Sequence, residues 1–264
     1  MTNKKNCRYV YGPVASWRLG SSLGIDPISA EEKICTFDCV YCQLGRTKVF
    51  SDERHVFVSV KDVVDELKTL PVVAVDYITF SGAGEPTLAK NLGDMIQAVR
   101  KVRNEKIAVI TNASLMNRKD VREDLSQADF ILAKLDAGSE DLFQEINRPM
   151  KGISFDSFLQ SMKEFRAIYK GRFALQMMFI LANEGDAGRM AAIAKELHPD
   201  EVEINTPLRT CGVRPLCEAA VCKIESRFRA LCGAQSSVIN VFNGLHKKVS
   251  AISTPDTLKR RGKS

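Results

Sequence analysis

Residues 33–45, KICTFDCVYCQLG, place Cys35, Cys39 and Cys42 within eight positions, and Tyr41 directly precedes the last of them. The spacing C-x3-C-x2-C brings three thiols onto one short loop. Zinc in a structural site needs four protein ligands, so a zinc site would have to recruit Cys7 or His55 from outside the loop. A four-iron, four-sulfur cluster has four iron corners, and three thiolates leave one iron without a protein ligand. The loop therefore predicts a metal centre, with an open corner if that centre is a cluster.

The composition is that of a globular protein, with 264 residues, 45% of them hydrophobic and 27% charged. Eight cysteines are spread unevenly over a chain far longer than small disulfide-bonded secreted domains, which favours reduced thiols and metal ligation. The first residues contain no apolar run of signal-peptide length, and nowhere do 18 apolar residues follow one another. We therefore expect a cytoplasmic protein with no membrane partner.

The formal net charge of +6 comes partly from the two ends of the chain. Solvated tails and contact with a phosphate-rich partner such as RNA both account for such a pattern. The residues concerned are Lys4, Lys5 and Arg8, followed near the other end by Lys247, Lys248, Lys259, Arg260, Arg261 and Lys263.

After the cysteine loop, short apolar runs alternate with amphipathic segments. Near-continuous apolar runs separated by helices predict parallel strands that are covered by helices or closed into a barrel. Six strands are expected when KICTF is counted as the first, which predicts an incomplete α/β barrel, (β/α)6, with its chemistry at the carboxyl ends of the strands. The expected strands are 33–37, 76–82, 106–112, 129–137, 173–181 and 201–208, and the expected helices are 59–70, 91–104, 121–128, 154–171, 188–199 and 221–233.

One large domain is the simplest organisation, because no Pro/Gly/Ser-rich linker interrupts residues 55–210. We expect a barrel core over residues 1–210, including the N-terminal segment. Residues 211–264 are expected to form a cysteine-containing extension of helix and strand with a basic tail.

The cysteine spacing, the aromatic residue before the last cysteine, and the position after a first strand resemble the radical S-adenosylmethionine (SAM) superfamily. YGPVASWRLGSSLGIDPI at 11–28 and CVYCQLG at 39–45 resemble its wyosine-synthase-related iron–sulfur oxidoreductase branch, and the resemblance covers residues 9–210. It implies a six-stranded partial α/β barrel with a [4Fe-4S] cluster whose open iron binds the amino and carboxylate groups of SAM. It also implies reductive cleavage of SAM to methionine and a 5′-deoxyadenosyl radical, which abstracts hydrogen from a substrate.

The run FSGAGEPTL at 80–88 ends the second expected strand. It resembles the Gly-Gly-Glu motif of the superfamily, with Ala83 in place of the usual middle residue. The resemblance implies that Gly82, Gly84 and Glu85 hold the amino group of SAM. A plain strand-to-helix turn with a proline at the helix start is the alternative.

Polar residues at three other strand ends either cap the next helix or reach into the mouth of the barrel. The resemblance implies that the ribose hydroxyls of SAM are met at the third and fourth strand ends and that Tyr41 packs against the adenine; a core or exposed tyrosine is the alternative. The strand-end residues are Thr111 and Asn112, Lys134 and Asp136, and Asn205 and Thr206.

Two further groups concern the substrate. Gln176 interrupts an apolar strand and either points into the barrel or occupies a hydrogen-bonded edge, while Met177 and Met178 beside it are expected in the core. Arginine side chains that flank the mouth in sequence bind either a substrate carboxylate or phosphate, or a surface acid. These are Arg18, Arg148 and Arg209.

Cys211, Cys217, Cys222 and Cys232 follow the last strand with spacing C-x5-C-x4-C-x9-C. Four thiols suffice for an auxiliary iron–sulfur cluster, but Cys232 also falls on the apolar face of the helix 221–233, as a core residue would. A wyosine-type enzyme would need an N-terminal cysteine set, of which only Cys7 is present, so a tRNA substrate stays open.

The leading hypothesis is a radical SAM enzyme that receives electrons from a reductant such as flavodoxin or ferredoxin. Its substrate would be an RNA nucleoside, a residue of another protein or a small metabolite. The alternatives are a non-catalytic iron–sulfur electron carrier and a zinc-stabilised RNA-binding module.

Overall fold

The computed structural model describes residues 8–244 and 247–261. One curved sheet of eight strands organises them, in the order β1-β2-β5-β6-β7-β8-β9-β10. Every neighbouring pair from β2 to β10 is parallel, and β1 is antiparallel to β2 at one edge. The strands are β1 (Val10–Ser16), β2 (Gly20–Ile25), β5 (Tyr77–Phe80), β6 (Lys106–Thr111), β7 (Phe130–Lys134), β8 (Arg172–Met178), β9 (Glu201–Asn205) and β10 (Ser237–Asn240).

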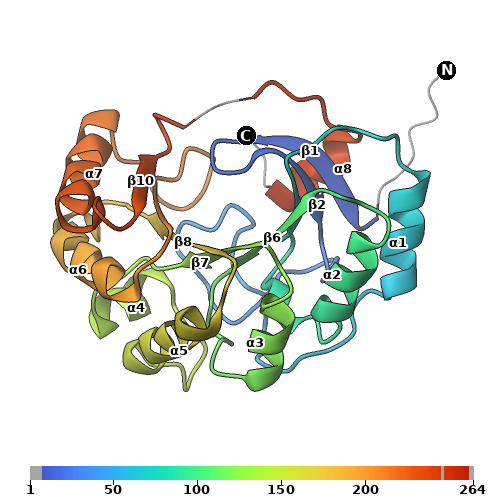
Figure 1. Cartoon of the computed structure of the whole chain (residues 1–264). Coiled ribbons are helices and arrows are strands. Elements are labelled where there is room, and N and C mark those ends of the chain that lie inside the picture. Colours follow the sequence, from blue (N-terminus) through green and yellow to red (C-terminus); the bar gives the residue numbers. More distant parts are fainter. Residues whose placement is uncertain (1–7, 245–246, 262–264) are drawn as a thin grey trace.

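Helices other than the last, α8, cover the outer, convex side of this sheet, so that sheet and helices form an incomplete barrel (Figure 1). This confirms the predicted fold class. The helices are α1 (Val60–Thr69), α2 (Leu92–Arg100), α3 (Lys119–Leu125), α4 (Glu140–Ile146), α5 (Phe155–Ile168), α6 (Ala187–Leu197), α7 (Glu218–Cys232) and α8 (Thr254–Arg261), with short 3-10 turns at Pro86–Leu88 and Glu184–Asp186.

Successive side chains along the strands point to opposite faces of the sheet and form two separate apolar layers. On β7, Ile131 and Ala133 belong to the large core under the helices, whereas Phe130 and Leu132 belong to a smaller cluster on the concave side. The smaller cluster fills the lower part of the barrel interior and also contains Leu19, Ala108 and Ala174. The upper part of the interior, toward the carboxyl ends of the strands, is left for polar side chains.

The expected helices form where their caps and apolar faces predict them. Ser59 accepts the N–H of Asp62 at the start of α1, and Ser154 accepts the N–H of Ser157 at the start of α5. The short helix α4 was not predicted; it begins at Ser139, which accepts the N–H of Leu142.

The prediction that KICTF forms the first barrel strand is wrong. Only Ile34–Cys35 (β3) is extended, and it pairs with Val49–Phe50 (β4) in a separate two-stranded sheet. The first barrel strand is β2, whose sequence GSSLGI lacks the apolar run used to find the others. Glycine and serine are small enough to face the crowded interior there, so hydrophobic periodicity does not mark this strand.

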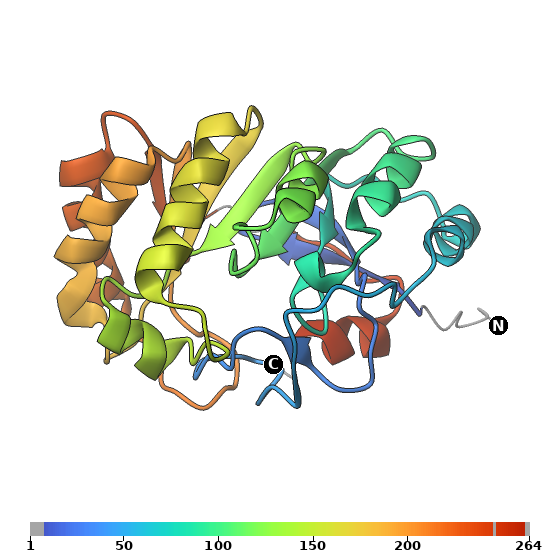
Figure 2. The same cartoon turned by 90° about the horizontal axis from the view of Figure 1, so that it is seen from below.

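Residues beyond 210 join the same sheet. Strand β10 pairs with β9, α7 packs against α6 and β10, and α8 packs against β1. Figure 2 shows α8 beside β1, on the side of the sheet away from the row of outer helices. A domain boundary at residue 210 stays a prediction. Among the described residues, no helix combines the length and apolarity that crossing a bilayer requires.

The turn Trp17-Arg18-Leu19 between β1 and β2 covers the lower end of the barrel interior. Ser16 Oγ accepts the N–H groups of Arg18 at 3.3 Å and Leu19 at 3.1 Å, which fixes the turn. The Leu19 side chain is 3% exposed and packs into the concave cluster. Because β2 runs parallel to its neighbours, this turn lies at the amino ends of the strands.

The substitution Leu19→Ala is expected to lower the free energy of unfolding by about 3 kcal/mol, since it leaves a cavity among packed side chains. Urea unfolding followed by circular dichroism measures the change. Leu181→Ala is the matched control, because Leu181 is 82% exposed and its loss should cost less than about 0.5 kcal/mol. Equal losses in the two variants would show that the turn does not close the interior.

Candidate functional site

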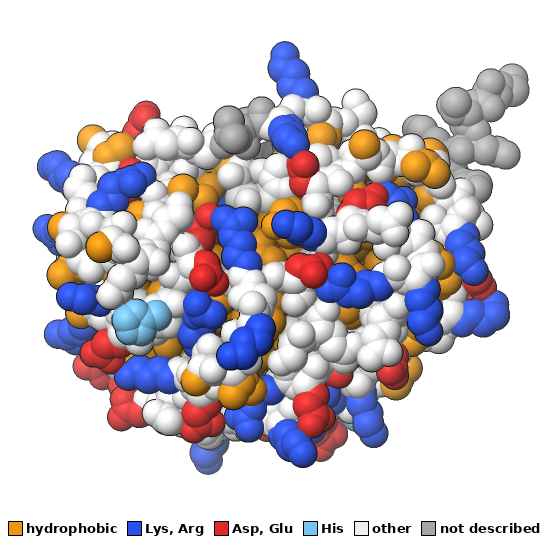
Figure 3. All heavy atoms as spheres, in the orientation of Figure 1, with side chains coloured by type: hydrophobic (Ala, Val, Ile, Leu, Met, Phe, Trp, Pro, Cys, Tyr) orange, Lys and Arg blue, Asp and Glu red, His pale blue; other side chains and the backbone are white. Residues whose placement is uncertain are grey.

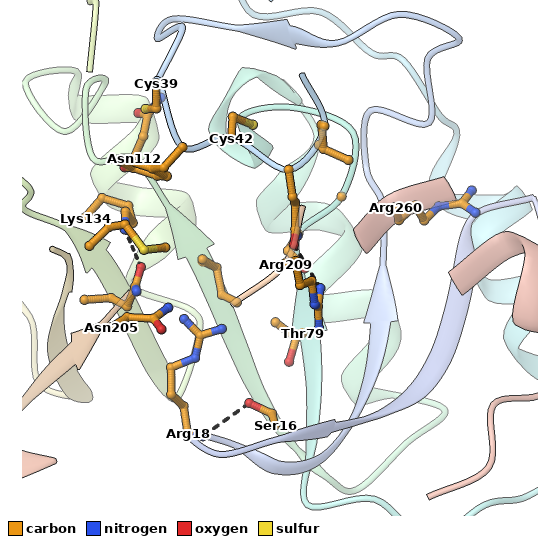
Figure 4. A pocket seen from close by; sticks show the side chains of 18 of the residues that line it. Ser16, Arg18, Cys39, Cys42, Thr79, Asn112, Lys134, Asn205, Arg209 and Arg260 are labelled. Carbon is orange, nitrogen blue, oxygen red and sulfur yellow. Dashed lines mark hydrogen bonds between the residues drawn. The ribbon is translucent and has the colours of Figure 1, made fainter. Parts of the chain in front are cut away.

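A cavity of about 510 Å³ opens on the concave side of the sheet. The three cysteines of the loop line one side of it, and polar residues at the ends of the strands line the rest (Figure 4). Eight of the nine residues expected at the cofactor lie on its wall, namely Tyr41, Gly82, Gly84, Glu85, Thr111, Asn112, Lys134 and Asn205; Asp136 does not.

The cysteine loop has a defined backbone. Cys39 C=O accepts the N–H of Cys42 at 3.0 Å, and Cys42 C=O accepts the N–H of Gly45 at 3.0 Å, so two successive turns carry the thiols. The N–H of Val40 binds the C=O of Ile146 at 2.9 Å and anchors the loop to the end of α4. The loop is thereby held over the cavity.

Burial disfavours the charged form of two of the thiols, Cys35 and Cys39. It raises the pKa of Cys35 to about 12 and that of Cys39 to about 11. Amide groups contact two of the sulfurs, since Asn112 Nδ2 lies 3.5 Å from Cys35 Sγ and Asn147 Nδ2 lies 3.4 Å from Cys39 Sγ. Such N–H···S contacts favour the thiolate, which is the form that binds metal, over the thiol.

Lys33 is a cation that the sequence analysis did not single out. Burial alone would lower its pKa, but the charges of Cys42, Cys35 and Cys39 raise that pKa overall. Its Nζ donates to Gly45 C=O at 3.2 Å, which keeps it on the loop. Its position directly before β3 is the only sequence signal that could have identified it.

The donor set suits a cluster. Among the residues described, no group of three or more His, Cys, Asp or Glu side chains is close enough to hold one metal ion. This does not count against a four-iron cluster, which holds its thiolates at separate corners. His55, one of the two alternative zinc ligands, is exposed, with its Nε2 3.5 Å from Glu53 Oε2, and the other, Cys7, lies outside the described residues.

The segment 82–85 lies directly against the cysteine loop. The N–H of Glu85 donates to Ile34 C=O at 3.1 Å. A Cβ atom on Gly84 would lie 1.9 Å from that same carbonyl oxygen, so only glycine fits there. Asp26 borders the other side of the segment and accepts the N–H of Ala83 at 3.2 Å.

Glu85 is buried and already well satisfied. Its Oε1 accepts the Thr87 N–H at 3.1 Å and the hydroxyls of Thr87 at 2.7 Å and Thr111 at 2.6 Å, while Oε2 accepts the N–H of Asn112 at 2.7 Å. Burial raises its pKa, although these hydrogen bonds oppose the shift. The side chain joins the ends of β5 and β6, and Oε2 keeps room for one more donor.

Asp136 is 2% exposed and lies behind the cavity wall. Its Oδ2 accepts the Tyr41 hydroxyl and Asn147 Nδ2, and its Oδ1 accepts the Met178 N–H at 2.7 Å and lies 3.0 Å from Lys134 Nζ. A ribose contact by Asp136 would require an exchange of these partners and stays a prediction. As it stands, Asp136 fixes the Tyr41 ring, which has Lys134 Nζ 5.0 Å from its centroid.

The arginines flanking the mouth in sequence separate in space. Arg18 and Arg209 line the cavity, and Arg209 donates to Gln43 Oε1 at 3.0 Å, whereas Arg148 does not line it.

Gln176 points into the barrel: Lys134 Nζ donates to its Oε1 at 2.5 Å. Met177 is buried in the core, as expected, but Met178 lies on the cavity wall.

An auxiliary cluster bound by all four C-terminal cysteines is excluded by the geometry. Cys217 and Cys232 mark opposite ends of the 15-residue helix α7, which at 1.5 Å per residue sets them about 22 Å apart. Cys232 is buried and its thiol donates to Ala191 C=O at 3.4 Å. Cys211 packs in an apolar cluster with Tyr41 and Cys39, beside the cysteine loop.

Comparison with curated proteins finds relatives of similar size and a much longer one. A UPF0026 protein of Synechocystis sp. is 43% identical over 201 residues, 76% of this chain and 76% of that protein. A UPF0026 protein of Methanocaldococcus jannaschii is 38% identical over 233 residues, 84% of this chain and 72% of that protein. GTPase Obg of Brachyspira hyodysenteriae is 34% identical over 265 residues, 97% of this chain but 38% of that protein, so the chain corresponds to well under half of it.

Among solved structures, TYW1 with a lysine-pyruvate adduct bound has a TM-score of 0.63 at 16% identity, covering 86% of this chain and 78% of that chain. This likeness concerns the fold. A sequence model of the Radical SAM superfamily matches residues 33–195, from the start of the cysteine loop through most of α6. That match covers more than half of the chain, and the chain belongs to the radical SAM superfamily of enzymes.

Proposed function

We propose that this enzyme holds a [4Fe-4S] cluster on Cys35, Cys39 and Cys42 and binds SAM in the adjoining cavity. When bound, the reduced cluster would supply one electron that cleaves SAM to methionine and a 5′-deoxyadenosyl radical, which takes a hydrogen atom from the substrate. The proposal is carried by one observation: the cysteine loop and the segment 82–85 are hydrogen-bonded to each other and line one cavity.

The protein's own contribution is orientation and exclusion of water. Cys35 is 8% exposed, so little water reaches the sulfurs from that side. The Lys33 ammonium and the amides of Asn112 and Asn147 would offset the negative charge of three thiolates. A dry, polar-walled site limits side reactions of a radical.

Around SAM we assign roles by position. The backbone of Gly82 and Gly84, with the remaining acceptor position of Glu85, would receive the amino group. Tyr41 would pack against the adenine. The ribose would be met by the polar strand ends Thr111, Asn112, Lys134 and Asn205, all of which line the cavity.

A soluble reductant such as flavodoxin or ferredoxin would supply the electron. The substrate is an RNA nucleoside, a protein residue or a small metabolite. On the face shown in Figure 3, Lys and Arg side chains are interspersed with Asp and Glu and do not form one continuous basic surface. That face gives no support to RNA binding, and a concave cavity of about 510 Å³ favours a small substrate or substrate end.

Cys39→Ala is expected to abolish both cluster binding and SAM cleavage, because two thiolates cannot hold a cluster with an open corner. Anaerobically purified protein is assayed for iron and sulfide, and then with dithionite and SAM for 5′-deoxyadenosine. Cys217→Ala is the matched control, since that thiol is exposed at the start of α7. The control should retain about four irons per chain and full cleavage.

The same assays separate the competing functions. A wild-type protein that binds iron and sulfide but gives no 5′-deoxyadenosine above background would reject the enzyme proposal in favour of an electron carrier. One zinc per chain and no absorbance near about 400 nm would indicate the zinc module instead.

Glu85→Gln is expected to weaken SAM binding at least about tenfold, because an amide nitrogen replaces one acceptor oxygen and a charge-assisted hydrogen bond is lost. Equilibrium dialysis of labelled SAM against cluster-loaded protein measures the affinity, and thermal melting reports the structural part of the effect. Glu145→Gln, at an exposed position on α4, serves as the control. Lower thermal stability with unchanged SAM affinity would show that Glu85 only joins the ends of β5 and β6 and does not bind SAM.

A further inference from the structure

Two residues that line the cavity, Arg18 and Gln176, are not used by the proposed cluster and SAM contacts. Parallel pairing sets Lys134, Gln176 and Glu203 opposite one another on β7, β8 and β9, so their side chains form one layer across the barrel interior. Arg18 reaches this layer from below, from the turn that closes the barrel, and points toward the middle of the cavity (Figure 4). The cysteines lie on the opposite side of the cavity in the same view.

The amide nitrogen of Gln176 is available to a ligand. Gln176 is 3% exposed, and its Nε2 is buried without a hydrogen bond in the part of the chain described. A buried donor without a partner costs free energy that a bound acceptor would recover.

Arg18 has no strong counter-charge. Its Nε lies 3.8 Å from Glu203 Oε2, too long for a hydrogen bond, and both carboxyl oxygens of Glu203 are buried without a hydrogen bond among the described residues. Glu203 is fully buried, and burial raises its pKa well above the ordinary value, as does the neighbouring Glu201 carboxylate. Because no hydrogen bond joins Arg18 to Glu203 among the described residues, the guanidinium is available to a ligand in the cavity.

We propose that Arg18 and Gln176 form a binding site for an oxyanion, a carboxylate or phosphate group of the substrate. The planar guanidinium matches either group, and the Gln176 amide adds a donor. The purpose of this site depends on the proposed function. An anionic group bound at Arg18 would hold the rest of a small acidic substrate between the turn at Trp17-Arg18-Leu19 and the SAM pocket.

Trp17 provides a direct measurement, because it is the only tryptophan of the chain, lines the cavity, and has Arg18 Cζ 5.5 Å from its ring centroid. Anaerobically purified protein is titrated with inorganic phosphate and, separately, with acetate, at constant ionic strength set by chloride. We expect a saturable change in Trp17 fluorescence with at least one of the two anions. The anion that gives it identifies phosphate or carboxylate as the substrate group.

Two variants test the assignment. Arg18→Gln removes the charge, and Gln176→Glu replaces the unpartnered amide donor by an acceptor while keeping an oxygen for Lys134. Each should weaken anion binding at least about tenfold. Arg227→Gln, at an exposed position on α7, should bind as the wild type does. Thermal melting checks folding, and the Gln176 variant decides the matter if the Arg18 variant does not fold.

The proposal is overturned if neither anion saturates by about 100 mM, or if both variants bind like the wild type. Neither result depends on the cluster chemistry. Formation of 5′-deoxyadenosine with no anion binding would reject this site alone, and anion binding without SAM cleavage would reject the proposed reaction alone.

Discussion

The close approach of two backbones, at Ile34 and at Gly84, is the constraint on which the site depends. It joins the cysteine loop, which leaves the barrel, to a strand end that belongs to the barrel. A side chain on Gly84 would push the two apart. The thiols and the proposed SAM loop therefore keep a fixed relation, which any direct contact between a cluster and SAM requires.

Buried polar groups hold the rest of the wall in place. Asp136 receives donors from the cysteine loop, from β8 and from the residue after α4, so one carboxylate orders three segments far apart in sequence. Glu85 does the same for the ends of β5 and β6. Fully hydrogen-bonded networks of this kind are rigid, because each member loses its partner if another moves.

The opposite side of the cavity differs: Arg18, Gln176 and Glu203 are close to one another yet incompletely paired. A rigid wall beside the thiols and unsatisfied donors across from them are the features expected of a cofactor side and a substrate side.

The fold could be predicted where hydrophobic periodicity is strong. The strands from β5 to β9 and their helices, apart from the short α4, follow apolar runs and capped amphipathic segments, and these were found. Strand β2 was missed because its inward positions are glycine and serine, and β10 because only two of its four residues are apolar. KICTF was wrongly placed in the barrel because an apolar run does not reveal which sheet it joins.

The sequence by itself determined that the three thiols of the cysteine loop share one environment, since they lie within eight consecutive residues whatever the fold. It also determined that the polar residues at the strand ends lie near one another, because parallel strands bring their carboxyl ends to one edge of the sheet. Only the tertiary structure decided that Asp136 braces Tyr41 behind the wall, that Lys33 and Asn147 lie beside the sulfurs, and that Arg18 and Gln176 line one cavity. Apart from Lys33, which belongs to the cysteine loop itself, these pairs of residues are 95 to 158 positions apart. Strand register and loop closure decide which of these residues meet, and neither can be predicted from the local pattern of residues.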